Sequence, residues 1–347
     1  MRQQRILFVT TVAILTVGWL IWCRTKSMLT SSQPSQFIRT VSGLPQDVHG
    51  WDIFTLYGKL FAYPIRSGKP PFTIYQIDPV NEQVVKSIVV DQMIDLQAVI
   101  AKHYQTSDAW LADQGFFMWE IDQQRNIAYA TKPSKLPTNV EEFCANGFEG
   151  IYVINMTTRE VKNFIEHPGF LHMILHPSGK KLYIEAPEGK VKVLDTEKLE
   201  WIKEFFVAGY IVLHFNGFSN DARYLFCSYA GGGLIVIDTI EDKVEEWGEQ
   251  VNNKAHSDYS ASFRAPFALS EDKQEIYGPA AFVDIANIYK LKGGVISIDL
   301  TQKKINRVLV LSQESECLSA VVMNTKLFVS SWESIFVIDI DRWRQGQ

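Results

Sequence analysis

The sequence lacks the short motifs that mark several common classes of enzyme. It contains no G-x-S-x-G, no H-E-x-x-H, no P-loop, no C-x-x-C and no C-x-x-C-H. These absences remove the sequence signatures of serine hydrolases, zinc proteases, nucleotide-binding loops, dithiol sites and c-type haem attachment. The 347 residues include no basic block, and their formal net charge is −5. Nucleic-acid binding therefore has no electrostatic support, and we expect no nucleic-acid partner.

Cysteine is also scarce, with four residues in the whole chain. Cys23 ends a hydrophobic run, which leaves Cys144, Cys227 and Cys317 and thus at most one bridge among them. This count excludes a small scaffold held together by disulfides. Cys227 stands inside a strand-like apolar run (YLFCSY), which is typical of a buried, inert thiol.

The first 30 residues differ from the rest of the chain. Residues 6–22 form an uncharged, mostly apolar run of 17 residues with basic side chains on both flanks. That length is close to the minimum for a membrane-spanning helix, and no A-x-A cleavage site follows. We interpret residues 1–30 as a signal anchor, with a cleaved signal peptide as the alternative. The chain is then a single-pass membrane protein whose remainder lies on the extracytoplasmic (periplasmic, extracellular or luminal) side.

One pattern of residues recurs six times along the chain. In each copy an apolar, largely β-branched run ends in Asp or Asn, a polar turn follows, and a second strand-like run begins. Asp and Asn suit this place because their side chains cap tight turns, while β-branched residues favour strands. The six positions are Asp78, Asn155, Asp195, Asp238, Asp299 and Asp339.

A second pattern precedes each copy, in which a tight polar turn leads into an apolar and aromatic strand, as in GKKLYIE (179–185). Each unit thus has strand a, a turn, strand b, a loop, strand c, a turn and strand d. Four short antiparallel strands in roughly 40 residues are typical of a propeller blade. The sequence predicts an all-β fold in which residues 31–347 form a single β-propeller domain with six recognisable blades. An open solenoid or a sandwich is the alternative.

The two ends of the repeat region suggest how the ring closes. The last copy leaves little room for strand d before Gln347, whereas residues 35–41 (SQFIRTV) are an unpaired strand candidate. We expect this N-terminal strand to close the last blade and remove the open sheet edges. The 77-residue gap between Asp78 and Asn155 leaves room for a seventh blade, but the helical spacing in residues 91–105 favours a short helix there.

All five longer insertions fall in b–c or d–a connections, which emerge at the same end of a blade. Because loops on a rigid scaffold commonly carry function, we expect this loop-rich face to bind a small molecule or a protein partner. The insertions span residues 64–71, 90–116, 132–150, 248–266 and 278–294.

Polar and aromatic side chains in or next to these connections are the candidate binding residues, because such a mixture suits a ligand pocket. No catalytic residue and no cofactor is assigned. No metal site is predicted, because His167, His172 and His176 lie at opposite ends of one strand and turn. His172 and His214 belong to strands a, which line the axis, and we interpret them as core or channel histidines. The candidates are His103, Tyr104, Trp110, His167, His256, Tyr259, Arg264 and Tyr289.

The repeated segments, including HPSGKKLYI, GLIVIDT and GVISIDL, resemble the YVTN-type propellers. That group includes the heavy or β chains of quinoprotein amine dehydrogenases, which have seven blades where six copies occur here. The resemblance implies an exported propeller that supports a redox partner or holds a small amine. It transfers no functional residue, because the matched positions build blades.

The sequence is consistent with two functions. The first is a membrane-anchored binding module that presents its loop-rich face, which the one-sided insertions favour. The second is an enzyme or enzyme subunit, amine dehydrogenase-like or lactonase-like, that acts on a small molecule in the central funnel. The His, Tyr, Asp and Arg content of the same loops motivates this alternative.

Overall fold

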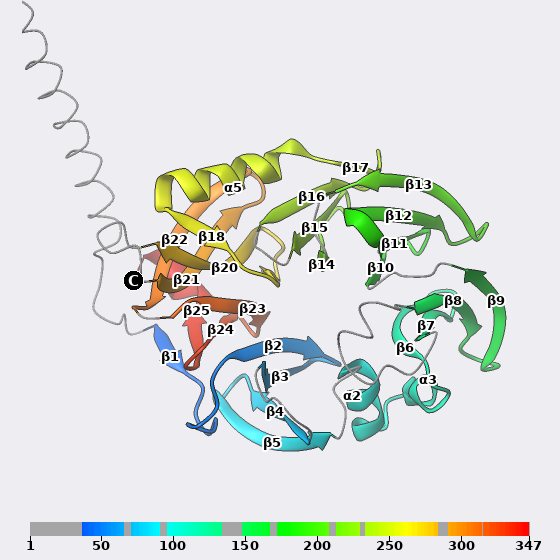
Figure 1. Ribbon diagram of the computed structural model, residues 1–347, viewed down its shortest axis with the longest axis horizontal. Coiled ribbons are helices and arrows are strands. Elements are labelled where there is room, and N and C mark those ends of the chain that lie inside the picture. The colour runs from blue at the N-terminus through cyan, green and yellow to red at the C-terminus, as the bar shows by residue number, and fades with distance from the viewer. Residues whose placement is uncertain are drawn as a thin grey trace, which may run out of the picture.

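The computed structural model describes residues 37–65, 71–90, 96–133, 148–166, 172–207, 213–229, 233–283, 291–313 and 315–346. Within these ranges the chain is mostly β-strand, and its strands form six antiparallel sheets. The sheets follow one another in chain order around a common centre (Figure 1), an arrangement consistent with a β-propeller. No helix in these ranges is long and apolar enough to cross a membrane. The predicted anchor, residues 1–30, lies outside them.

The first three sheets each contain four strands in consecutive order. Sheet one contains β2 (Trp51–Leu56), β3 (Lys59–Pro64), β4 (Phe72–Asp78) and β5 (Gln83–Val90). Sheet two contains β6 (Phe117–Asp122), β7 (Ile127–Pro133), β8 (Phe148–Asn155) and β9 (Glu160–Glu166). Sheet three contains β10 (Met173–Leu175), β11 (Lys181–Ala186), β12 (Lys190–Asp195) and β13 (Glu200–Phe206), with the short helix η1 (Pro187–Gly189) between β11 and β12.

The other three sheets vary this plan. Sheet four contains β14 (Leu213–Phe218), β15 (Tyr224–Tyr229), β16 (Leu234–Asp238) and the short β17 (Lys243–Val244). Sheet five has a divided first strand, β18 (Ala261–Phe263) and β19 (Ala268–Leu269), followed by β20 (Glu275–Val283), β21 (Leu291–Asp299) and β22 (Lys304–Ser312). Sheet six contains β23 (Cys317–Met323), β24 (Lys326–Ser331), β25 (Ile335–Asp339) and β1 (Ile38–Thr40).

The last sheet joins the two ends of the described chain, as the sequence predicts. Strand β1 pairs antiparallel with β25, and Ile38 lies opposite Ile338. Phe37 and Val41, which flank β1, are 6% and 7% exposed and belong to the core. The N-terminal strand therefore supplies strand d of the last sheet and covers an edge that would otherwise be open.

The six Asp and Asn positions end strand c; five cap c–d turns, and Asp339 caps the helix Ile340–Gln345 that follows β25. Each side-chain oxygen accepts a hydrogen bond from a backbone N–H two or three residues further along, at 2.7–3.2 Å. Asn155, for example, accepts from the N–H groups of Thr157 and Thr158. The predicted turn chemistry is confirmed at five positions, and Asp339 makes the same kind of cap at the start of a helix.

A ring of buried aromatic side chains repeats at one register of strand b. In every sheet the aromatic residue follows a buried Leu, Ile or Ala and is itself at most 1% exposed. The repeat shows that the units share one packing plan as well as one strand order. The residues are Phe61, Tyr129, Tyr183, Phe226, Tyr277 and Phe328.

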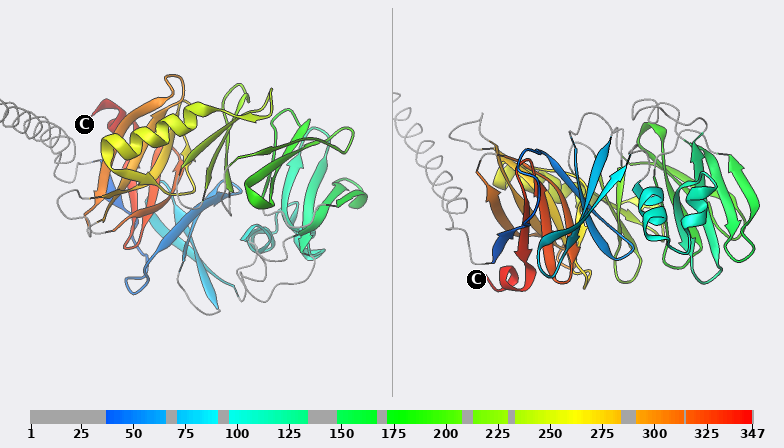
Figure 2. Two further views of the ribbon diagram at one scale, coloured as in Figure 1. Left: turned by 45° about the horizontal axis from the view of Figure 1, so that its top comes forward. Right: turned by 90° about the horizontal axis from the view of Figure 1, so that it is seen from below.

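The connections divide the molecule into two sides. The tight a–b and c–d turns lie at one end of each sheet, here called the turn side, and the b–c and d–a connections lie at the other end, the loop side. Helix α6 (Ile340–Gln345) follows β25 and so lies on the turn side, as the edge-on view in Figure 2 shows. The N-terminal end of β1 lies on the same side, because β1 runs antiparallel to β25.

Two short helices, α2 (Leu96–Tyr104) and α3 (Ala109–Asp113), join sheet one to sheet two. Ile100 packs with the core of sheet one, and the adjacent Ala101 packs with the core of sheet two. The helices lie within the thickness of the disk (Figure 2), so α2 fills a position in the ring and does not cover it as a lid. The predicted helix is confirmed over residues 96–104.

The d–a insertion at residues 248–266 was expected to be a loop, and this expectation is wrong. Residues Glu246–Tyr259 form helix α5, which packs against β16, β18 and β22 (Figure 1). Trp247, Val251 and Ala255 are buried at intervals of four residues, so the helix rests on a single narrow apolar stripe. Because β17 contains only two residues, α5 takes the place of most of the outer strand of sheet four.

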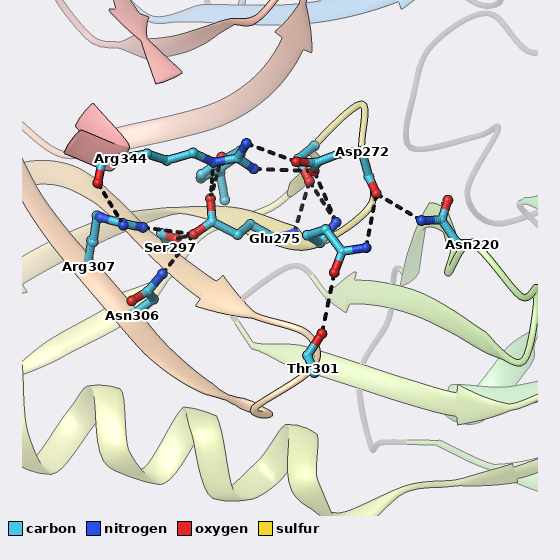
Figure 3. Close-up of polar contacts among 11 residues, drawn as sticks. Asn220, Asp272, Glu275, Ser297, Thr301, Asn306, Arg307 and Arg344 are labelled. Atoms are coloured by element: carbon cyan, nitrogen blue, oxygen red, sulfur yellow. Dashed lines mark hydrogen bonds and ion pairs between the residues drawn. The ribbon is translucent and has the colours of Figure 1, made fainter. Parts of the chain in front are cut away.

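The C-terminal helix is held to sheet five by a buried carboxylate (Figure 3). One oxygen of Glu275 accepts hydrogen bonds from Ser297, Asn306 and Arg307, and the other accepts from Tyr277 and Arg344, all at 2.8–3.0 Å. Arg344 on α6 also pairs with Asp272 at 2.9 Å. Burial alone would raise the pKa of Glu275, but these partners hold that pKa below its usual value. Since every polar group here has a partner, the network is structural.

Candidate functional site

Three polar side chains meet at the loop-side ends of the first two strands of sheet three and the first strand of sheet four. His172 directly precedes β10, Glu185 lies near the end of β11, and His214 lies near the start of β14. His172 Nδ1 lies 2.8 Å from Glu185 Oε2, and the centres of the two imidazole rings are 5.6 Å apart. These three residues are here called the axial cluster.

Glu185 ties the axial cluster to both sheets. Its other oxygen accepts the backbone N–H of Leu213 at 2.7 Å, and the residue is only 4% exposed. The contact with Glu185 Oε2 engages Nδ1 and orients the His172 ring, and Nε2 takes no part in this contact. The His172 side chain is 37% exposed, so a ligand from solvent can reach it.

His214 provides a second, uncharged imidazole. Burial, followed by the proximity of His172, lowers its pKa to about 4, so it is neutral at neutral pH. The cluster therefore combines one oriented imidazole, one neutral imidazole and one buried carboxylate. Such a set can accept and donate hydrogen bonds to a polar ligand.

The thiol beside the cluster is not a nucleophile. Cys227 on β15 is fully buried, and both burial and the charge of Glu185 raise its pKa. A thiol held in the protonated form is a weak nucleophile. In the described part of the chain, His172 forms its hydrogen bond with the carboxylate of Glu185 and not with a hydroxyl or a thiol.

Two further carboxyl groups lie on inner strands. Asp52 on β2 accepts hydrogen bonds from the Tyr63 hydroxyl and the Ile53 N–H, both at 2.8 Å, but burial raises its pKa. Glu120 on β6 accepts from the backbone N–H of Leu175 in the next sheet, and burial still raises its pKa to about 7. Carboxyl groups with raised pKa values are enriched at functional sites.

The inner strands also share polar contacts between sheets. The Asn216 side chain on β14 accepts the N–H of Phe267 at 3.3 Å, and Ser319 Oγ on β23 accepts the N–H of Ile53 at 3.2 Å. Strands β2, β6, β10, β14, β18, β19 and β23 contain no Lys or Arg. The ionisable groups that they present toward the centre are thus acids and histidines. Among the described residues, no group of three or more side chains is arranged to hold a metal ion.

Three of the predicted candidates lie at the α2–α3 insertion. The exposed His103 and the half-buried Tyr104 end α2, with ring centres 5.0 Å apart. Trp110 lies on α3, which packs against α2, and its ring faces the guanidinium of Arg159 at 5.4 Å. The buried Nε1 of Trp110 has no hydrogen-bond partner among the described residues.

The remaining described candidates lie elsewhere. His256 and Tyr259 are on α5, where His256 is exposed and Tyr259 packs against the core of sheets four and five. Arg264, after β18, donates to Glu316 at 2.6 and 2.8 Å. The structure therefore distributes these candidates over three neighbourhoods. Two more, His167 and Tyr289, lie outside the described residues.

Sequence reasoning missed Asp52, Glu120 and Glu185. A signal was present, because Asp52 and Glu120 each stand between a Trp and an Ile inside an apolar strand (WDI, WEI). A lone carboxylate in such a run is costly to bury without a local purpose. Glu185 ends an apolar strand b in the same manner. What the sequence does not reveal is which of these strands lie side by side.

Known proteins that are similar to this chain are found by structure and not by sequence. No family model matches the sequence, and no curated protein matches it. Among solved structures, the chain is similar to Kuenenia stuttgartiensis hydrazine synthase with a TM-score of 0.46 and 13% sequence identity. The match covers 91% of this chain and 82% of that one.

Proposed function

We propose that this chain is a six-bladed β-propeller that acts as a binding module, with a small polar ligand bound at the axial cluster. Six antiparallel sheets of four or five strands with one repeated aromatic register, together with a closing N-terminal strand, support six blades. The strand–Asp–turn copies support a YVTN-type propeller. The observation that carries the binding site is the orientation of His172 by Glu185 next to neutral His214.

The axial cluster suits recognition because its groups are held in place before a ligand arrives. Glu185 is fixed by the Leu213 N–H of the neighbouring sheet, so the His172 ring is positioned across a junction between two sheets. A preorganised polar group loses less entropy when it binds a ligand. The cluster lies at the loop side, where the longer connections between strands also lie.

An enzyme remains the second candidate, and the His172–Glu185 pair is the observation that favours it. A histidine oriented by a carboxylate is the arrangement of a general base. Cys227 does not supply a nucleophile for it, since this thiol is buried with a raised pKa. A water molecule, or a hydroxyl group of the substrate, would supply the nucleophile.

We further propose that the protein is exported and anchored through residues 1–30. The N-terminal end of β1 lies on the turn side, so a membrane anchor would place that side toward the bilayer and the axial cluster away from it. Carbonate extraction of membranes tests the anchor: the full chain should stay in the membrane fraction and a chain without residues 1–30 should not. Retention of the shortened chain would contradict it.

A thermal-shift screen tests the axial site. The full chain, purified in detergent, is screened against small anions, cations and neutral polar compounds. At least one compound should raise Tm by about 2–4 °C when present at 100 times Kd or more. The same compound should have no effect on His172→Asn, whereas His256→Asn, which alters an exposed histidine on α5, should respond like the wild type. An unchanged shift in His172→Asn would refute the axial site.

A further inference from the structure

Two lysine ammonium groups face one tyrosine ring at the junction of α2 and sheet one. Lys59 Nζ, at the start of β3, lies 5.0 Å from the centre of the Tyr104 ring, and Lys86 Nζ, on β5, lies 5.2 Å from it. The exposed His103 lies beside the same ring, with ring centres 5.0 Å apart. Three cationic or ionisable nitrogen groups thus surround a single aromatic side chain.

The framework that holds these groups is well packed. The Tyr104 hydroxyl donates to the Gln76 side chain on β4, and its ring lies 6.1 Å from that of the fully buried Phe61. One turn earlier on α2, Ile100 is completely buried against sheet one. Because Lys59 and Lys86 are on strands of that sheet, the core sets the relative backbone positions of all three residues.

In the described part of the chain, no carboxylate lies within ion-pair distance of the two lysines of this cluster. Neither Lys59 nor Lys86 forms an ion pair there, whereas Lys102 on the same helix pairs with Asp113 at 3.3 Å. The contrast matters because the protein as a whole carries a net charge of −5. Burial and the charge of Lys86 lower the pKa of His103, which is consistent with a local excess of positive charge. An anion would relieve the repulsion between these groups.

We propose that Lys59, Lys86 and His103 bind an oxyanion, a phosphoryl or sulfate group, next to Tyr104. Ammonium and imidazole N–H groups are strong donors to such oxygens. The site is independent of the axial cluster, because it lies on sheet one and α2. Lys59 directly follows the turn of residues 57–58, so the site opens near the turn side, where either a soluble ion or a lipid headgroup would have access.

Lysine acetylation footprinting with mass spectrometry tests the proposal on the full chain in detergent. Inorganic phosphate at about four times Kd should slow acetylation of Lys59 and Lys86 about fivefold relative to chloride of equal ionic strength. Lys254, an exposed lysine on α5, is the control and should not change. A parallel arm uses vesicles with and without phosphatidic acid. Protection by phosphate identifies a soluble oxyanion, and protection by phosphatidic acid alone identifies a headgroup.

The variant Lys86→Gln separates a shared site from two independent lysines. It should reduce the protection of Lys59 at the same phosphate concentration, while Tm confirms that the protein remains folded. The proposal is overturned if chloride protects equally, if Lys254 is protected to the same degree, if neither phosphate nor phosphatidic acid protects the two lysines, or if Lys59 protection is unchanged in Lys86→Gln.

Discussion

The side-chain amide of Asn252 on α5 pairs with both backbone polar groups of Leu234 at the start of β16. Asn252 Oδ1 accepts the Leu234 N–H at 2.8 Å, and its Nδ2 donates to the Leu234 carbonyl at 2.9 Å. A neighbouring strand would make the same two bonds. The helix therefore replaces the missing part of β17 in hydrogen bonding as well as in packing, which is needed because buried backbone groups left unpaired are costly.

Replacing Asn252 by leucine should lower the free energy of unfolding by about 1–3 kcal/mol, because two buried backbone groups lose their partner. Denaturant unfolding of the full chain measures the change. Asn253→Leu, one residue further on the exposed side of the helix, is the matched control and should change stability by less than about 0.5 kcal/mol. Equal effects of the two variants would show that the edge pairing contributes nothing.

Helix α2 uses the same device on a different sheet. Gln97 accepts the N–H of Trp119 and donates to its carbonyl, both at 3.1 Å, on the free side of the inner strand β6. Helices α2 and α5 thus each pair an amide side chain with both backbone polar groups of one residue at a strand edge. This explains how long d–a connections are accommodated without loss of backbone hydrogen bonds.

Arg344→Met should destabilise the protein by about 2–4 kcal/mol, because it leaves the buried Glu275 with fewer partners and releases Asp272. Arg342→Met alters an exposed arginine on the same helix and should cost less than about 1 kcal/mol. Thermal and chemical unfolding compare the two. A loss in Arg342→Met as large as in Arg344→Met would contradict a specific role of the Glu275 network.

Glu120→Gln should stabilise the protein at high pH and have little effect at low pH. The pKa of Glu120 is raised from 4.5 to about 7 in the folded state, so its stabilising contribution is complete below pH 4.5 and is lost as the pH rises through about 7. Above that pH, the variant should gain up to about 3 kcal/mol. Unfolding measured from pH 4 to pH 8 tests this, with the exposed Glu197→Gln as control; a gain that does not depend on pH would be contrary evidence.

His214→Gln should flatten the acid side of the stability profile. The pKa of His214 is lowered from 6.5 to about 4 by burial, so its contribution is present above pH 6.5 and is lost as the pH falls through about 4. The variant should therefore lose less stability than the wild type between these values. The exposed His256→Gln serves as the control, and parallel profiles for all three proteins would rule out the assignment.

Removing residues 1–41 should cause a large loss of stability, because it deletes β1 together with the buried Phe37 and Val41. Removal of residues 1–36 alone leaves the closing strand and is the control. Thermal unfolding and size-exclusion chromatography compare the two chains. The longer deletion should also increase self-association, since it exposes the edge of β25. Similar behaviour of both chains would mean that β1 does not close the sheet.

Local patterns along the chain predicted much of the fold. The strand–Asp–turn copies located the c–d turns, the polar turns before apolar strands located strands a and b, and residues 35–41 identified the closing strand. Each of these signals is carried by neighbouring residues. Helix α5 was not predicted because its sequence is mostly polar. Its buried Trp247, Val251 and Ala255 lie at intervals of four, and three such residues are a weak helical pattern in 14.

The sequence by itself determined the repeated strands, their turns and the expectation of a closed ring. These depend on the alternation of apolar and polar residues and on side chains that cap nearby backbone groups. Only the tertiary structure decided which polar groups meet. His172, Glu185 and His214 come together because the first two strands of sheet three lie beside the first strand of sheet four, and Lys59, Lys86 and Tyr104 meet because α2 packs on sheet one. Contacts of this kind depend on packing between distant segments, which no local pattern encodes.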